Sequence, residues 1–360
     1  MSLETVTMDR INELSQKYSV PIMDTLMIAL NRYGIMMDIE DKRIRFRLKM
    51  LGSEEVYYFA VCVNTFESPF TVDAERRLFF NGQLVGRIVD IEKDTCDTTY
   101  FRRNKTALTL NSNMRSMCHG CTFCGTYNLD PDDRIDMSDE KKVHDFLVRF
   151  LKENDVKDLE HLLRVTVCTG CFKDEKDLVE HLVMVNNVFK EFGFNKRIRY
   201  IGSQIRSDDA MDYLQKNLDY FSLSLTVECF SDREKRMRKE KASLDMNGIK
   251  GVLDKAKKHG FSTNYLYIVG LDELDIFKEG ITELAPYINR MPIYQVMQNY
   301  VIEHEEQRVE AAKDLEYYIQ ARKIIEAQYA GTELKPRSWE NYRSLFYSTY
   351  QDKPYECIRI

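Results

Sequence analysis

Short apolar segments alternate with longer segments of helical periodicity along residues 106–297. Strands separated by helices pair in parallel, and their crossover connections are right-handed. The sequence therefore predicts an α/β fold, a partial (βα)6 parallel barrel, whose functional site lies at the carboxyl ends of the strands. The first barrel helix is expected at residues 138–152, with Ser138 as its N-cap. The predicted strands are residues 106–110, 163–168, 197–201, 221–227, 264–269 and 293–297.

The segments on either side of this barrel have a different character. Before it, residues 9–33 have helical periodicity, and residues 77–89 predict a β hairpin that turns at Asn81-Gly82. After it, residues 304–329 contain neither glycine nor proline and predict one long amphipathic helix. We therefore expect a small α+β N-terminal domain at residues 1–104, the barrel at residues 105–302 and a helical C-terminal extension at residues 303–360.

The composition is that of a soluble globular protein, with 44% hydrophobic residues, 31% charged residues and a net charge of −6. This excess of negative charge argues against nucleic acid or an anionic membrane surface as a partner. No apolar run approaches the roughly 18–20 residues that a membrane helix requires. Residues 1–5 are polar and do not begin a signal peptide. We therefore expect a cytoplasmic protein.

Three of the nine cysteines, Cys118, Cys121 and Cys124, lie within seven residues in the loop after the first predicted strand. Random placement of nine cysteines would give only about 0.006 such triplets per chain, so the spacing indicates a function. In a reducing compartment these side chains are thiols. Thiolates select soft metals, namely zinc, copper(I) or iron–sulfur clusters.

Three thiolates on one short loop suit three corners of a [4Fe–4S] cluster, whose fourth iron is then open to a small-molecule ligand. Structural zinc sites instead use four ligands, normally as two separated pairs. A zinc site completed by Cys168 or Cys171 is the alternative. The alternative function is that of a non-catalytic zinc- or iron–sulfur-binding regulatory or scaffold protein.

A strand, a three-cysteine loop with the aromatic Phe123 before its last cysteine, and a (βα)6 pattern together resemble the radical S-adenosylmethionine (radical SAM) superfamily. The resemblance covers residues 105–300. The usual loop of that superfamily has three residues between the first two cysteines, whereas only His119 and Gly120 stand there in this chain. The resemblance implies two cofactors, a [4Fe–4S] cluster and S-adenosyl-L-methionine. Their chemistry is reductive cleavage to a 5′-deoxyadenosyl radical, which abstracts hydrogen from the substrate.

The resemblance also implies the partners. They are a small-molecule or peptide substrate, in a setting such as natural-product biosynthesis, and an electron donor of the flavodoxin or ferredoxin type. We find no second cysteine cluster near the C-terminus and no cobalamin-binding pattern in residues 1–105.

The same resemblance places S-adenosylmethionine against the loops that follow several strands. A turn after the second strand would contact the amino group, and charged residues after the fourth would contact the ribose and the carboxylate. An I-x-G-x-x-E element after the fifth strand and the end of the sixth would surround the adenine. Most of the basic segment 233–241 is expected to be solvated, with one residue recruited inward. The implied cofactor contacts are Phe123, Thr169, Gly170, Glu228, Arg233, Arg238, Ile268, Gly270, Glu273 and Met297.

Overall fold

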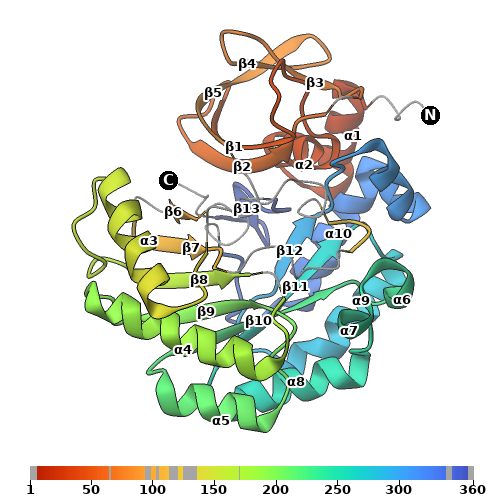
Figure 1. The fold of residues 1–360 in the computed structure, drawn as a ribbon. Helices are drawn as coiled ribbons and strands as arrows, with labels where there is room; N and C mark the ends of the chain where they lie inside the picture. The colour runs from red at the N-terminus through yellow and green to blue at the C-terminus, as the bar shows by residue number, and fades with distance from the viewer. Residues whose placement is uncertain are drawn as a thin grey trace.

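The described part of the computed structural model contains two large β-sheets, the smaller of which lies above the larger in Figure 1, and a small two-stranded one, with helices packed around them. None of the helices in the described part of the chain is long and apolar enough to cross a membrane. The structure describes residues 6–64, 66–93, 99–102, 105–112, 121–124, 136–169, 171–337 and 343–355.

The N-terminal segment forms two helices and an antiparallel five-stranded sheet in the order β2-β1-β5-β4-β3. The predicted hairpin is confirmed, because Asn81 and Gly82 join β4 to β5 with φ angles of 48° and 78°. Two successive positive φ angles suit the right-handed twist of the paired strands. The elements are α1 (Met8–Tyr18), α2 (Ile22–Tyr33), β1 (Arg43–Met50), β2 (Val56–Cys62), β3 (Phe70–Val72), β4 (Arg77–Phe80) and β5 (Gln83–Lys93).

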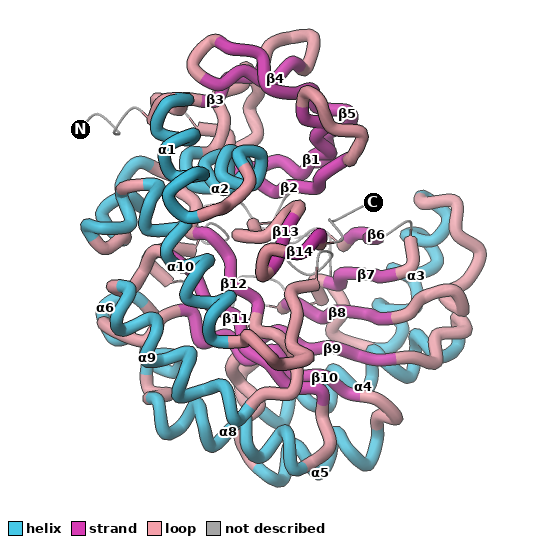
Figure 2. The backbone as a smooth tube through the Cα atoms, turned by 180° about the vertical axis from the view of Figure 1, so that it is seen from behind, coloured by secondary structure: helices cyan, strands magenta, loops and turns pink. Residues whose placement is uncertain are grey.

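The second sheet confirms the predicted partial barrel. Six strands, β7 to β12, pair in parallel in chain order, and an additional strand that the sequence did not predict, β6, pairs antiparallel with β7. Figure 2 shows this sheet curled, with helices along its outer side. Its strands are β6 (Tyr100–Arg102), β7 (Ala107–Leu110), β8 (Arg164–Cys168), β9 (Arg197–Gly202), β10 (Phe221–Glu228), β11 (Ser262–Val269) and β12 (Ile293–Val296).

Four of the helices between these strands begin at a side chain that accepts a hydrogen bond from the first turn, namely Asp139, Asp174, Ser207 or Asp245. For the first of them the cap is Asp139, which accepts from the backbone N–H of Lys142, so the predicted cap Ser138 is wrong by one residue. Both side chains can cap a helix, and the sequence does not distinguish them. The helices are α3 (Glu140–Glu153), α4 (Glu175–Glu191), α5 (Asp208–Asn217), α6 (Arg233–Arg236), α7 (Lys239–Ala242), α8 (Met246–Lys258), α9 (Leu274–Leu284) and the 3-10 turn η3 (Ala285–Tyr287).

Alternate residues of the curled sheet face the helices and the barrel interior. The helix-facing side is apolar and includes Val165, Ile198 and Leu223 in the main core. The other side is polar. There, Arg199 and Arg290 both donate to the hydroxyl of Ser224 at 2.8 Å, and Ser224 donates to Asn264 at 2.6 Å. The interior is therefore a hydrogen-bonded polar layer.

The segment that follows the barrel is not the single helix predicted at residues 304–329. It consists of two 3-10 helices and one α-helix, separated by extended residues at Arg308 and Asp314. At the first break, the side chain of Arg308 points inward and joins a buried network of ion pairs. At the second, Asp314 caps the α-helix that follows. The elements are η4 (Ile302–Gln307), η5 (Glu310–Lys313), α10 (Leu315–Gln328) and a small hairpin, β13 (Thr349–Tyr350) and β14 (Lys353–Pro354).

The two ends of the chain are joined by a buried ion pair. Arg322 on α10 donates to Asp24 on α2 at 2.6 Å, and Asp24 also accepts from the backbone N–H of Ser348 at 2.9 Å. Three aromatic residues of this C-terminal segment, Phe346, Tyr347 and Tyr350, are buried. Trp339 and Tyr342 lie outside the described residues.

Candidate cofactor site at the carboxyl ends of the strands

The second half of the cysteine loop is held against the segment that follows β10. Cys121 forms a β-bridge with Met237, and the backbone N–H of Thr122 donates to the carbonyl of Arg236 at 2.9 Å. Cys121 and Cys124 are both half-buried. Burial raises the pKa of the Cys121 thiol, although Lys241 and a backbone hydrogen bond from Arg238 favour its thiolate form. Cys118 lies outside the described residues.

Phe123 anchors this loop in a small apolar cluster that is separate from the main core. The cluster joins the ends of β10, β11 and β12 and contains three of the predicted cofactor contacts: Phe123, Ile268 and Met297. Its other buried members are Cys229, Met237, Ala242 and Leu271. The structure therefore places the cysteine loop over the carboxyl ends of three strands.

A buried ion pair lies beneath the two thiols. Glu228, the last residue of β10, accepts a hydrogen bond from Lys241 of α7, and their side chains are only 9% and 11% exposed. Burial alone would lower the pKa of Lys241, but Glu228 and the nearby Cys121 and Cys124 raise it above its ordinary value. The second carboxylate oxygen of Glu228 is buried and has no hydrogen-bond partner among the described residues.

Glu228 is also conformationally unusual. Its φ angle is +71°, and the pairing of β10 with β11 shifts register between Thr226 and Glu228. Side chains in this left-handed region are uncommon and cluster at functional sites, and a bulge re-aims the residue that it carries. Among the residues predicted from sequence, Glu228 therefore has the most distinctive backbone.

The basic segment after β10 contributes two buried cations, Arg233 and Lys241, where the sequence predicted one. Arg233 is buried and donates to the carbonyls of Val227, Cys229 and Lys241, so its guanidinium holds the loop together. Arg238 is half-buried. Lys241 was not predicted from the sequence as a site residue, because a lysine within a run of basic residues is normally exposed to solvent.

The I-x-G-x-x-E element at the end of β11 contains both buried and exposed residues. Gly270 has a φ of +120°, and a Cβ atom there would lie 2.8 Å from the hydroxyl of Tyr318. Glu273 is exposed at the start of α9, whereas the neighbouring Asp272 is fully buried. Asp272 accepts from the backbone N–H of Phe230 at 2.7 Å. The sequence alone did not show which of the two adjacent acidic residues, Asp272 or Glu273, is buried.

A second buried network fixes the end of β12. Arg308 donates to the carbonyl of Met297 at 2.8 Å and to Glu305 at 3.2 Å, and Arg32 of α2 donates to the same carboxylate at 3.1 Å. Burial alone would raise the pKa of Glu305, but Arg308 and Arg32 hold it below its ordinary value. This carboxylate therefore connects the N-terminal helices to the site.

The loop after β8 is partly described. Thr169 is half-buried, and Gly170 lies outside the described residues. The side-chain amide of Gln204 bonds both the N–H and the carbonyl of Phe172, at 3.0 and 2.9 Å, and so links this loop to the one after β9. Burial raises the pKa of Cys168 to about 11. Among the described residues, no group of three or more histidine, cysteine or acidic side chains is placed to hold a metal ion.

No family model matches the sequence, and no curated protein is significantly similar to it. Among solved structures, the chain is similar to the radical S-adenosylmethionine methyltransferase TsrM from Kitasatospora setae, which was determined with cobalamin and a [4Fe–4S] cluster bound. The TM-score is 0.37 at 8% identity, over 52% of this chain and 36% of TsrM, so the match spans about a third of that enzyme.

A radical SAM methyltransferase from Sphaerobacter thermophilus is also similar, with a TM-score of 0.44 at 12% identity, over 97% of this chain and 98% of that chain. Both TM-scores are below 0.5, so the function of this chain is inferred from its own residues.

Proposed function

We propose that this protein is a radical SAM enzyme in which Cys118, Cys121 and Cys124 hold a [4Fe–4S] cluster. The observation that supports this most directly is the position of Cys121 and Cys124, two half-buried thiols beside the buried Glu228–Lys241 pair at the carboxyl end of β10. When bound, the cluster and S-adenosylmethionine supply a 5′-deoxyadenosyl radical that abstracts hydrogen from the substrate.

The residues of the site fit these two groups. Burial raises the pKa of the Cys121 thiol, and the ammonium of Lys241 acts against this by favouring the thiolate, the form that binds iron. The unpartnered oxygen of Glu228 is an acceptor in a dry environment, where leaving it unpaired is costly. An amino or hydroxyl group of S-adenosylmethionine would satisfy it. The cluster of Phe123, Ile268 and Met297 provides an apolar wall that excludes water.

The substrate and the reductant follow from the proposed chemistry. We propose a small-molecule or peptide substrate and an electron donor of the flavodoxin or ferredoxin type.

The test is to purify the protein without oxygen, measure iron and sulfide, and then add reductant and S-adenosylmethionine. We expect iron and sulfide in equal amounts and release of 5′-deoxyadenosine. Cys121→Ala and Cys124→Ala should lose both, whereas Cys62→Ala, which removes a buried thiol on β2, should retain both. Bound zinc without 5′-deoxyadenosine would instead identify a non-catalytic metal-binding protein.

The variant Lys241→Met tests whether Lys241 acts in the cofactor site or only stabilises the fold. Methionine keeps most of the length of the side chain but leaves the carboxylate of Glu228 buried without its partner. We expect this variant to bind less iron, because Cys121 loses the ammonium that favours its thiolate. We also expect it to bind S-adenosylmethionine about tenfold or more weakly, because Glu228 loses the hydrogen bond from a charged group that holds it in place, and such bonds contribute about 1.5–3 kcal/mol. Unchanged affinity would remove the Glu228–Lys241 pair from the proposed binding site.

A further inference from the structure

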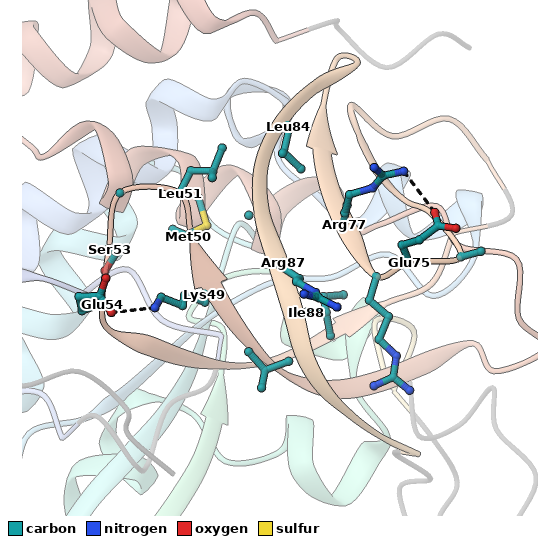
Figure 3. Close-up of a pocket in the computed structure, with 15 residues that line it drawn as sticks. Lys49, Met50, Leu51, Ser53, Glu54, Glu75, Arg77, Leu84, Arg87 and Ile88 are labelled. Atoms are coloured by element: carbon teal, nitrogen blue, oxygen red, sulfur yellow. Dashed lines mark hydrogen bonds and ion pairs between the residues drawn. The ribbon is translucent and has the colours of Figure 1, made fainter.

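A groove of about 1060 Å³ lies on the five-stranded sheet, outside the candidate cofactor site. Figure 3 shows it between the turn after β1, the turn before β4 and the first half of β5. It is lined by residues 49–54, 74–77, 84 and 86–89.

The strands themselves produce this concave shape. Gly86 of β5 pairs with Met50 on one side and Leu78 on the other, and the register shifts close to both pairings. Such irregularities bend a sheet. A Cβ atom at Gly86 would lie 2.9 Å from the carbonyl oxygen of Lys49, so the close approach of the strands requires glycine. The groove is therefore fixed by the backbone.

Positive charge is concentrated across the groove. Arg87 pairs directly with Lys49 of β1 and with Arg77 of β4, so three cationic side chains form a row over three adjacent strands. Like charges directly opposite each other destabilise a sheet. Arg76 adds a fourth cation at the rim.

Two carboxylates line the groove, and both are already in ion pairs. Glu54 accepts from Lys49 at 2.8 Å, and Glu75 accepts from Arg77 at 3.2 Å. The side chains of Arg76 and Arg87 are exposed and form no ion pair with any residue that the structure describes. Lys49 is thus paired with Glu54, and Arg77 with both Glu75 and the neighbouring Asp73, so the positive charge of the groove that has no counter-ion among the described residues is that of Arg76 and Arg87.

Apolar side chains accompany these cations. Leu51, Leu84 and Val89 line the same groove and are 58%, 38% and 53% exposed. A site for a small anion or for a nucleic-acid backbone does not need exposed aliphatic side chains. Aliphatic groups beside arginines instead complement a chain that carries both carboxylates and apolar side chains.

We infer that this groove is the docking site of an acidic peptide segment of a partner. Its carboxylates would pair with Arg76 and Arg87, and its apolar side chains would cover Leu51, Leu84 and Val89. The repulsion along the Lys49–Arg87–Arg77 row would be relieved on binding. This inference is independent of the cluster chemistry.

Fluorescence anisotropy with labelled peptides of about twelve residues, containing glutamate and leucine in varied order, tests the inference. We expect members of this set to bind the intact protein, more weakly as salt is added. Arg87→Glu and Arg76→Glu should each weaken binding by about tenfold, and the double variant should instead bind the matching lysine–leucine peptides. Arg149→Glu, at an exposed arginine on α3, is the matched control and should leave binding unchanged.

Thermal unfolding provides a second measurement. Because Arg87 faces Lys49 and Arg77, Arg87→Glu should raise the melting temperature of the free protein while it weakens peptide binding. Substitution of a surface residue without a binding role would not both raise the melting temperature and weaken peptide binding. The inference is overturned if no acidic peptide binds at about 1 mM, the weak limit of specific recognition. It is also overturned if Arg87→Glu and Arg149→Glu bind equally well, or if a single-stranded oligonucleotide binds the groove in preference to the peptides.

Discussion

The carboxylate of Glu305 lies between two buried guanidiniums, and replacing it with glutamine should strongly destabilise the protein. Arg32 and Arg308 both donate to it, at 3.1 and 3.2 Å, and all three side chains are almost fully buried. Glu305→Gln keeps the shape of the side chain and removes the charge. The two arginines would then repel each other without an anion between them.

The magnitude follows from the geometry. At a charge separation of about 4 Å and an effective dielectric constant of about 20, each ion pair contributes roughly 4 kcal/mol of Coulomb energy. Part of this offsets the cost of burying the charges, and removing one partner of a buried ion pair typically costs about 3–5 kcal/mol. We expect a loss of about 4 kcal/mol in the free energy of unfolding, roughly a thousandfold in the ratio of folded to unfolded protein.

The loss should depend on pH. The pKa of Glu305 is lowered in the folded protein, so its stabilisation is fully present above the ordinary value of 4.5 and is lost as the pH falls through the lower folded value. The difference between the wild-type protein and Glu305→Gln should therefore be largest near neutral pH and shrink in acid. Urea unfolding followed by circular dichroism at several pH values measures it.

Glu306→Gln is the control, because Glu306 is the next residue of η4 and is exposed. It should change the free energy of unfolding by less than about 0.5 kcal/mol at any pH. The reasoning would be refuted by a loss below about 1 kcal/mol for Glu305→Gln, or by a loss that stays constant from neutral pH into acid.

Three further outcomes are expected. Gly270→Ala should destabilise by about 3 kcal/mol in urea unfolding, because its φ is positive and its Cβ would meet Tyr318, whereas Gly52→Ala, with positive φ but open space, should cost only about 1 kcal/mol. Burial lowers the pKa of His181 to about 4, so its stabilisation is complete above pH 6.5 and is lost as the pH falls toward 4; His181→Gln should remove about 3 kcal/mol of that pH dependence. Ser224→Ala should lower the free energy of unfolding by about 2 kcal/mol, because two buried guanidiniums lose a shared acceptor, and a value near zero would contradict this.

The strands of the barrel could be predicted from sequence because each depends on local patterns. Alternating apolar residues and intervening helices are visible within short windows, and the resulting six parallel strands were found within a few residues of their predicted ends. The hairpin at Asn81-Gly82 was predictable for the same reason. Neighbouring strands that follow one another in the chain require no long-range information.

The features that were missed depend on residues far apart in the chain. The helix predicted at residues 304–329 is broken at Arg308 and Asp314, and within this region Glu305 accepts from Arg32, which lies 273 residues earlier. Lys241 becomes a site residue only because the chain folds back and places it beside Glu228 and the cysteine loop. Neither partner is visible in a window around the residue itself, and local periodicity gives no sign of the pairing.

The joining of the two chain ends has a consequence for how the protein is made. Asp24 on α2 finds its partners at Arg322 and Ser348, and the latter lies 324 residues further along the chain. At about 5–20 residues per second, a ribosome needs roughly 16–65 seconds to produce that stretch. During this time Asp24 lacks the partners that hold it in the folded protein. We therefore expect nascent chains to expose α2 until Ser348 has been synthesised, which makes this helix a natural contact for chaperones.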